Sequence, residues 1–194
     1  MQLELFDGPP PRDVAFFAIT PPAEVAARLK WLGGGFSRRH GLTGPRHRAE
    51  RLHISLWGTW LDPRRRDALA ASMGAIGAQM SWPEFEIALT RVRSFGQRGR
   101  RPLVLMCGEG AANGLEGLHD RLLDAAAAQG LQLKRRAYVP HLTLGYDDTA
   151  APETLLDPPV VWTARELVLI HSERGRGRYA TLGSWPFANA SRVA

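Results

Sequence analysis

The sequence contains a single cysteine, Cys107, and no long apolar run. One cysteine can form neither an internal disulfide nor a cysteine-based zinc site, so we expect neither kind of cross-link in the fold. No apolar stretch approaches the ~20 residues that a membrane-spanning helix needs. Residues 1–11 also lack the basic start and apolar core of a secretory signal, so we expect a cytoplasmic protein without a membrane partner.

Lysine is scarce as well. Only Lys30 and Lys134 are lysines among the 25 basic residues, which exceed the 19 acidic residues and give a net charge of +6. Arginine suits phosphate binding because its planar guanidinium donates two parallel hydrogen bonds. A GC-rich genome enriches arginine too, so the charge permits nucleic-acid binding and establishes no more. Hydrophobic residues make up 44% of the 194 residues, a composition that fits one globular domain or two small lobes.

Apolar periodicity predicts a mixture of strands and helices. Strands are predicted over residues 13–20, 52–60, 85–95, 101–107, 142–146, 160–172 and 178–185. Helices are predicted from residue 20 to a stop at glycines 33–35, from 62 to 80, and from 113 to 129, with a basic loop over 36–48. The last two strands are expected to form a closing hairpin. The mixture predicts an α+β fold with helices packed on largely antiparallel sheets.

Two segments share a pattern of histidine, apolar residue, hydroxyl residue and apolar residue. One is Leu52-His53-Ile54-Ser55-Leu56 and the other is Pro140-His141-Leu142-Thr143-Leu144. Side chains alternate between the two faces of a strand, so each histidine shares a face with its hydroxyl residue. The Cα atoms of a histidine and its hydroxyl residue are then about 6.6 Å apart, which lets both side chains contact one phosphoryl group.

A histidine pair suits phosphodiester hydrolysis. The reaction needs a base that activates water and an acid that protonates the leaving oxygen, and an imidazole can do either near neutral pH. The hydroxyls of Ser55 and Thr143 can donate hydrogen bonds to the non-bridging oxygens, where negative charge develops. One such motif is common among structural histidines, but two in the same apolar register are much less expected by chance.

Metal chemistry is the competing interpretation of the histidines. A zinc site needs three or four ligands, and the sequence has no His-x-His and no His-Glu-x-x-His. A two-histidine zinc site with further ligands stays an alternative, and a chelator would expose it. The acid–base scheme requires neither a metal nor a cofactor, so we expect none.

The paired motifs resemble those of the two-histidine phosphoesterase superfamily, in particular the bacterial 2′-5′ RNA ligase-like proteins, also called RNA 2′,3′-cyclic phosphodiesterases. The likeness covers most of the chain. Residues 16–19 resemble the first strand of the family, 51–56 and 139–144 its two motifs, and 167–172 with 179–186 its C-terminal hairpin. The resemblance implies a bilobal fold, with two pseudo-symmetric lobes of largely antiparallel sheet and flanking helices around a central cleft.

The resemblance also implies a domain organisation and a reaction. We expect a loose arm over residues 1–12, one bilobal phosphoesterase domain over 13–187 and a tail over 188–194. The implied reaction opens a 2′,3′-cyclic phosphate at an RNA end to a 2′-phosphate, with reversible 2′-5′ ligation as a related activity. The counterpart of His53 is usually assigned as the acid and that of His141 as the base.

One departure from the family concerns a phosphate contact. Many relatives carry a basic residue five positions after the second histidine, where this sequence has Tyr146, which is itself a candidate for substrate binding. Candidate replacements in the predicted hairpin turn are Arg174, Arg176 and Arg178, for which a solvated turn is the alternative. Tyr179 is a candidate for stacking on a base or ribose, or else a packed strand residue. His171 is a candidate accessory ligand, or else a core residue.

Other functions stay open on the sequence alone. The first alternative is a phosphoesterase that acts on small cyclic nucleotides or 2′-5′ oligonucleotides, and the second is a non-catalytic RNA-binding module that uses the same cleft. The presence of both histidines and both hydroxyls favours an enzyme, because a binding module has no need of an acid–base pair. We expect RNA ends or small cyclic nucleotides as partners, and a monomer, since no heptad or self-complementary patch is evident.

Overall fold

The computed structural model describes residues 13–62, 64–96, 99–131, 137–173 and 178–189. The described chain contains, in order, β1 (Val14–Ile19), α1 (Ala23–Arg39), the 3-10 helix η1 (Ala49–Arg51), β2 (Ile54–Trp60), α2 (Arg66–Ala78), β3 (Phe85–Ser94), β4 (Arg101–Cys107), α3 (Glu109–Ala128), β5 (His141–Asp147), β6 (Thr154–Ala164), β7 (Glu166–Glu173) and β8 (Arg178–Pro186). The predicted α+β class is confirmed.

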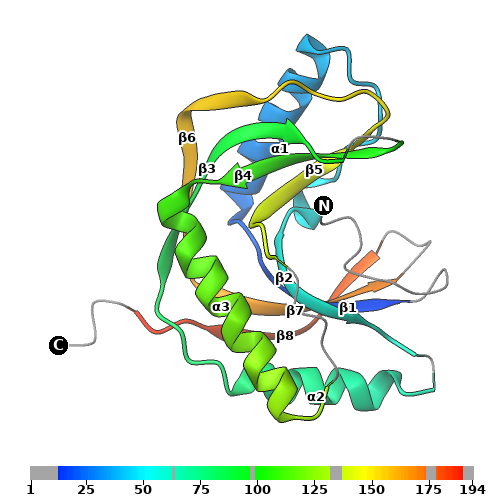
Figure 1. Ribbon diagram of the computed structural model, residues 1–194, viewed down its shortest axis with the longest axis vertical. Helices are drawn as coiled ribbons and strands as arrows, with labels where there is room; N and C mark the ends of the chain where they lie inside the picture. The colour runs from blue at the N-terminus through cyan, green and yellow to red at the C-terminus, as the bar shows by residue number, and fades with distance from the viewer. Residues whose placement is uncertain (1–12, 63, 97–98, 132–136, 174–177, 190–194) are drawn as a thin grey trace.

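The strands form one antiparallel sheet in the order β6-β3-β4-β5-β2-β1-β7-β8. The two strands that carry the motifs, β2 and β5, are neighbours at its centre, where Ile54 pairs with Leu142. β2 otherwise pairs with β1, and β5 with β4. The sheet therefore divides into lobe A (β2, β1, β7 and β8) and lobe B (β5, β4, β3 and β6), which Figure 1 shows below and above the junction.

The two motif strands share an irregularity. Leu56 in β2 has no partner in the register with β1, and Leu144 in β5 has none in the register with β4. Each is a β-bulge three residues after the motif histidine. A bulge bends its strand and increases the local twist. The matching bulges are thus a pseudo-symmetric feature of the two lobes.

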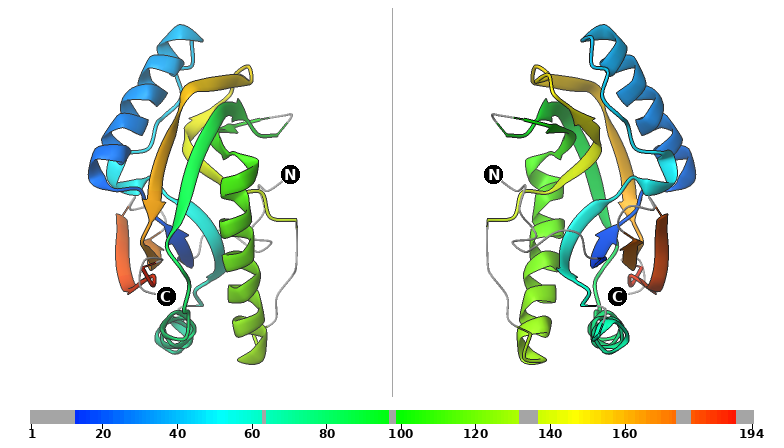
Figure 2. Two further views of the ribbon diagram at one scale, coloured as in Figure 1. Left: turned by 90° about the vertical axis from the view of Figure 1, so that its left-hand side faces the viewer. Right: turned by 90° about the vertical axis from the view of Figure 1, so that its right-hand side faces the viewer.

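The helices pack on different parts of the sheet. α1 packs against β5 and β6, α2 against β7 and β8, and α3 against β2 and β3. Figure 2 shows α1 and α3 at opposite sides of the molecule, with strands between them. The alternation predicted in the motifs is confirmed, because the aliphatic residues are buried in the main core and the histidine and hydroxyl residues are half-buried. The buried residues are Ile54, Leu56, Leu142 and Leu144.

The predicted stop of the first helix at residues 33–35 is wrong, since α1 continues through the three glycines to Arg39. A Cβ atom at Gly33 would lie 3.2 Å from the side chain of Leu144, so the helix approaches β5 closely at this point. Phe36, one turn later, is buried in the core. This packing outweighs the low helix propensity of glycine, which costs about 1 kcal/mol per residue. The predicted basic loop is correspondingly shorter.

The predicted strand over residues 160–172 is two strands. β6 ends at Ala164 and β7 begins at Glu166, and the two lie in different lobes. β6 pairs with β3 at one edge of the sheet, while β7 pairs with β1 and β8 near the other. Only Arg165 lies between the two strands, so no loop marks the boundary between them in the sequence. The predicted closing hairpin is present as β7 and β8.

Candidate active site

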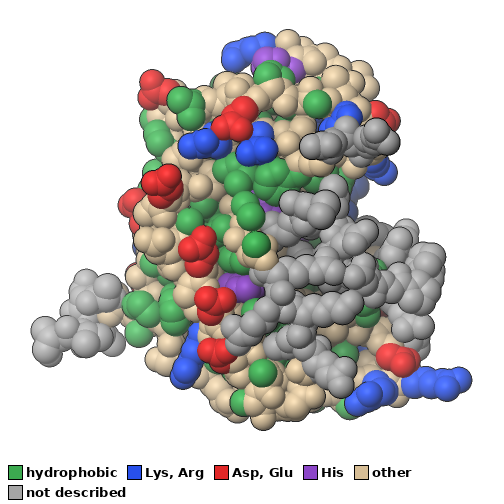
Figure 3. All heavy atoms as spheres, in the orientation of Figure 1, with side chains coloured by type: hydrophobic (Ala, Val, Ile, Leu, Met, Phe, Trp, Pro, Cys, Tyr) green, Lys and Arg blue, Asp and Glu red, His purple; other side chains and the backbone are tan. Residues whose placement is uncertain are grey.

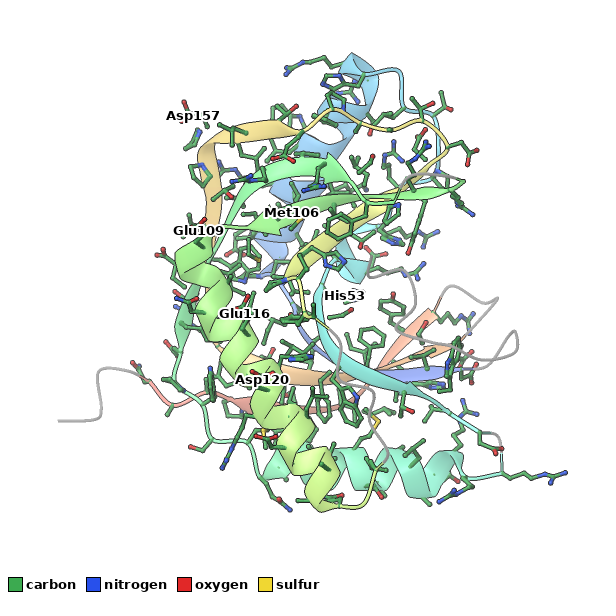
Figure 4. The ribbon with its side chains drawn as sticks, viewed as in Figure 1. His53, Met106, Glu109, Glu116, Asp120 and Asp157 are labelled. Atoms are coloured by element: carbon green, nitrogen blue, oxygen red, sulfur yellow. The ribbon has the colours of Figure 1, made fainter. Side chains whose placement is uncertain are left out.

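His53 and His141 lie at the boundary between the lobes. His53 immediately precedes β2, and His141 opens β5. Figure 4 shows His53 between the lobes, with Met106, the residue that pairs with His141 in the sheet, on the lobe B side. A positive charge on His141 lowers the pKa of His53, so the two imidazoles are close enough to interact electrostatically. The fold thus brings together two histidines that are far apart in the sequence.

Ser55 and Thr143 flank this histidine pair. The central strands pair at the residue that stands between the histidine and the hydroxyl residue of each motif. Continued by one residue in either direction, this antiparallel register sets His53 opposite Thr143 and His141 opposite Ser55. All four side chains then share the sheet face that points away from the main core. The arrangement can surround one phosphoryl group with two imidazoles and two hydroxyls.

Both imidazoles are anchored in the same way. His53 Nδ1 lies 2.7 Å from the carbonyl oxygen of Arg51, and His141 Nδ1 lies 2.7 Å from the carbonyl oxygen of Val139. A carbonyl oxygen only accepts, so each Nδ1 donates its proton, and in the neutral ring the lone pair is on Nε2. Neither Nε2 atom has a hydrogen-bond partner within the described residues. Each ring therefore offers Nε2 for proton transfer.

Aromatic rings support both histidines. The ring of Phe16 lies 4.8 Å from that of His53, and the ring of Phe95 lies 4.9 Å from that of His141, measured between centroids. The ring of Tyr179 meets His53 edge-on at 5.6 Å. Close packing restricts the rotation of the imidazoles, so the orientation of each Nε2 is set before substrate arrives.

The electrostatic surroundings keep both imidazoles neutral in the free protein. Burial lowers the pKa of His53 from 6.5 to about 4, although the hydrogen bond to the Arg51 carbonyl raises it; nearby charges on His47, His141 and Arg51 lower it further. Burial also lowers the pKa of His141, against the hydrogen bond to Val139. A proton on one ring disfavours a proton on the other, so the pair favours one acid and one base once a first proton binds.

Arg51 is a cleft residue that the sequence reasoning did not select. Its guanidinium carbon lies 4.4 Å from the ring centroid of Tyr179. Its charge lowers the pKa of His53 and that of His47, after burial, which is the larger cause for both. Its Nε is buried and has no hydrogen-bond partner among the described residues. The one available signal was the position of Arg51 two residues before the first histidine.

Tyr146, which replaces a basic residue common in the family, lies beside other aromatic and basic groups. The ring of His47 meets it edge-on at 5.8 Å, and the guanidinium of Arg100 lies 5.4 Å from its centroid. Burial and the Tyr179 phenol raise the pKa of Tyr146, while Arg100 and Arg51 lower it. Tyr146 and Tyr179, from opposite lobes, are therefore electrostatically coupled across the cleft.

The other candidate contacts have different positions. Arg178 is exposed at the start of β8 and, with Tyr179, lines a cavity in lobe A. Arg174 and Arg176, also predicted as candidates, lie outside the described residues. The structure therefore supports a place near the cleft for Tyr146, Arg178 and Tyr179 among the weaker candidates.

His171 does not face the cleft, which corrects its prediction as an accessory ligand. It alternates along β7 with Ile170, which lines the cavity on the cleft face, so its side chain points to the other face. The residue is 6% exposed, and its Nε2 lies 3.0 Å from the carboxylate of Asp13 and 3.1 Å from the guanidinium of Arg66. Through these two contacts, His171 instead links β7 to the start of α2 and to the residue before β1.

Tyr138 is another residue that the sequence did not single out. Its hydroxyl donates a 2.9 Å hydrogen bond to the carbonyl oxygen of Ser55, and its ring stacks on His119 with centroids 4.3 Å apart. Burial raises its pKa well above the usual value, so the phenol stays protonated as a donor. It ties the segment before the second motif to the backbone of the first motif and to α3.

Features typical of other sites are few in the described part of the chain. No group of three or more His, Cys, Asp and Glu side chains there could hold a metal ion. Burial raises the pKa of Cys107 to about 12, so its thiol is protonated at neutral pH, as expected of a core residue. None of the described helices is long and apolar enough to cross a membrane.

The bilobal antiparallel sheet and its paired motifs are those of the two-histidine phosphoesterases, and solved structures share this fold. Ligand-free LigT of E. coli has a TM-score of 0.67 and 25% sequence identity, over 91% of this chain and 98% of that one. LigT of E. coli complexed with ATP has a TM-score of 0.69 and 21% identity, over 92% and 99%. The protein TT0787 of Thermus thermophilus has a TM-score of 0.64 and 22% identity, over 89% and 97%.

The chain belongs to the 2′-5′ RNA ligase superfamily, whose family model matches residues 20–176. No curated protein matches it. The family and fold that the sequence predicted are confirmed, and together they indicate a phosphoesterase or ligase-like enzyme.

Proposed function

We propose that this protein hydrolyses the 2′,3′-cyclic phosphate ends of RNA to 2′-phosphates, with His53 and His141 as a metal-independent acid–base pair. With the 5′-hydroxyl of a second RNA in place of water as the nucleophile, the same site can form a 2′-5′ linkage, and O3′ again leaves with the proton from His53. The observation that carries the proposal is the matched anchoring of the two imidazoles. Each donates from Nδ1 to the carbonyl oxygen two residues upstream, which leaves its Nε2 for the substrate.

The proposed reaction moves two protons. Nε2 of His141 takes a proton from water as the water oxygen bonds to phosphorus. The bond between phosphorus and O3′ breaks, and the protonated Nε2 of His53 gives its proton to O3′. The phosphate stays on O2′. The hydroxyls of Ser55 and Thr143 donate to the non-bridging oxygens, whose charge grows in the transition state.

The low pKa of His53 is compatible with an acid role once substrate is bound. The value of about 4 describes the free protein, in which burial opposes the charge. A bound phosphodiester anion stabilises an imidazolium beside it and raises its pKa. The coupling between the two histidines then disfavours a second proton, so His141 stays neutral as a base.

The cleft also offers surfaces for the nucleoside. Tyr179 and Tyr146 present aromatic rings from opposite lobes, and Arg178 adds a cation at the edge of lobe A. Base stacking on aromatic side chains is a common means of holding single-stranded RNA. E. coli LigT, a structural relative, has been solved with 3′-AMP and with phosphate, which supports a nucleotide in this fold.

The test uses a short RNA that ends in a 2′,3′-cyclic phosphate, incubated with the purified protein in excess EDTA. We expect the wild type to form the 2′-phosphate, and His53→Ala and His141→Ala to lose this activity. His40→Ala is the matched control, because this imidazole packs on Phe36 at the end of α1. RNA binding without conversion by the wild type would favour a non-catalytic module, and inhibition by EDTA would favour a metal-dependent hydrolase.

A second candidate is a phosphoesterase for small nucleotides. The observation that favours it is that E. coli LigT has also been solved with ATP and with NADP+. A series of substrates from a nucleoside 2′,3′-cyclic phosphate to longer RNA separates the two candidates. A value of kcat/KM that does not rise with length would favour the small substrate.

A further inference from the structure

A cavity of about 550 Å³ lies in lobe A beside the first histidine. Its floor is formed by β7 and β8, and its wall contains Glu50 and Arg51 of η1 together with Arg48, the residue before η1. The volume is within the range of about 300–1,000 Å³ that is usual for small-molecule sites. None of the proposed catalytic side chains lines it, so it is a separate space next to the reaction centre.

Charge is separated along the floor of this cavity. Glu166, Val168 and Ile170 follow one another on the cavity face of β7. In the β7–β8 register, Tyr179 and Arg178 lie beyond Ile170. One end of the floor is therefore acidic, the middle is apolar, and the other end is aromatic and basic.

Arg51 strengthens the basic end. Its guanidinium lies over the ring of Tyr179, the residue next to Arg178. In the described part of the chain, neither arginine forms an ion pair with a carboxylate, and Arg51 Nε is buried without a hydrogen-bond partner. A guanidinium with a buried, unpartnered donor favours an anionic ligand, and phosphate matches its geometry.

The basic end is adjacent to the proposed reaction centre. Tyr179 meets the ring of His53 at 5.6 Å, and the Arg51 carbonyl accepts the hydrogen bond from His53 Nδ1. A phosphate at this end would thus lie next to the reacting phosphate. In an RNA end, the phosphate nearest in the chain to the cyclic phosphate is the 5′-phosphate of the terminal nucleotide.

The opposite flank of the molecule is unfavourable for a nucleic-acid chain. Exposed carboxylates follow the outer surface of α3, and Figure 3 shows them as a row of acidic side chains. They are Glu109, Glu116, Asp120 and Asp124. Their charge repels phosphates, whereas the arginines of the cavity attract them.

We propose that this cavity is a subsite for a second phosphate, in which Arg51 and Arg178 bind the 5′-phosphate of the terminal nucleotide. The apolar floor at Val168 and Ile170 then takes the preceding nucleoside. The inference rests on the proposed function for the position of the cyclic phosphate. The second-phosphate subsite makes the protein selective for the end of an RNA chain over a free nucleoside 2′,3′-cyclic phosphate.

The kinetic test compares adenosine 2′,3′-cyclic phosphate with its 5′-phosphorylated form. We expect the 5′-phosphate to raise kcat/KM of the wild type at least about tenfold, as befits hydrogen bonds between charged groups. Arg51→Gln and Arg178→Gln should bring this ratio close to one. The ratio cancels any general loss of catalysis in the Arg51 variant. Arg165→Gln removes a charge whose side chain is 71% exposed outside the cavity, and should keep the wild-type ratio.

A binding measurement makes the test independent of turnover. Adenosine 2′,5′-bisphosphate, the product of the 5′-phosphorylated substrate, should bind the wild type at least about tenfold more tightly than adenosine 2′-phosphate. The same two variants should lose this preference. Equal affinities in the wild type, or a preference that survives in both variants, would overturn the subsite even if the protein proves to be a cyclic phosphodiesterase. A preference without hydrolysis would support the subsite and refute the proposed reaction.

Discussion

Ile54 pairs with Leu142 across the centre of the sheet, and this pair joins the two lobes. Both residues are fully buried. Because side chains alternate along a strand, burying this aliphatic pair directs the neighbouring histidines and hydroxyls to the opposite face. The core of the protein and the geometry of its candidate active site are therefore set by the same contact.

The hydroxyls of the motifs give a first prediction. Ser55→Ala and Thr143→Ala should each lower kcat about 10²-fold, because each removes a donor to the charge that develops on the phosphoryl oxygens. Both side chains are half-buried in the cleft and not in the core, so the melting temperature should change little. The conservative variants Ser55→Thr and Thr143→Ser should keep most of the activity. Wild-type kcat in both alanine variants would remove the hydroxyls from the mechanism.

The pH dependence of kcat/KM follows from the lowered histidine pKa values. Burial lowers the pKa of His53 to about 4 and also lowers that of His141, so the proton that the acid needs is lost below the usual 6.5 as pH rises. Since kcat/KM reports the free enzyme, its optimum should lie below pH 6.5 and the rate should fall toward neutral pH. Steady-state kinetics across the pH range check this. An optimum above pH 6.5 would contradict the conclusion that the pKa values of His53 and His141 are lowered in the free protein.

The roles of the two histidines can be separated with an activated leaving group. In thymidine 3′-(p-nitrophenyl phosphate), p-nitrophenolate leaves without needing a proton. His53→Ala should therefore approach the wild-type rate on this substrate, while His141→Ala should stay impaired because water still needs a base. Release of p-nitrophenolate is followed by absorbance. The reverse pattern would exchange the two roles.

The position of His171 predicts a structural role. His171→Ala should lower the free energy of unfolding by about 1–3 kcal/mol, because the buried contacts with Asp13 and Arg66 lose a partner. The kcat/KM value should stay within about twofold of wild type, since the side chain is on the far face of the sheet from the cleft. Denaturant unfolding and steady-state kinetics measure the two quantities. A large loss of kcat/KM in a folded variant would return His171 to the active site.

The site could be predicted from the sequence where it depends on local alternation. A histidine and a hydroxyl residue two positions apart share a strand face whatever the surrounding fold, and the repeat of this pattern identified both halves of the site. The pairing of β2 with β5 joins segments that are far apart in the sequence, but the likeness of the two motifs already suggested one copy per lobe. The predicted residues His53, Ser55, His141 and Thr143 are therefore found in one region.

The parts that the sequence did not predict depend on contacts between distant segments. Gly33 remains helical because it packs closely on Leu144, which propensity alone does not reveal. The chain changes lobe at Arg165 without an intervening loop, so no turn signal marks the boundary between β6 and β7. Arg51 stands out only once its guanidinium is seen over Tyr179 with a buried, unpartnered Nε.

In the proposed mechanism, His53 and His141 act together on one phosphate. The most direct test of this pairing is kcat for a 2′,3′-cyclic phosphate RNA in EDTA, measured for His53→Ala, His141→Ala and the double variant. Each single variant should lose about 10²–10⁴-fold, the usual contribution of a general acid or base. The double variant should lose no more than about tenfold beyond them, because residues that act as one unit are not additive. A single variant that keeps more than about a tenth of wild-type kcat, or losses that multiply, would contradict a paired mechanism.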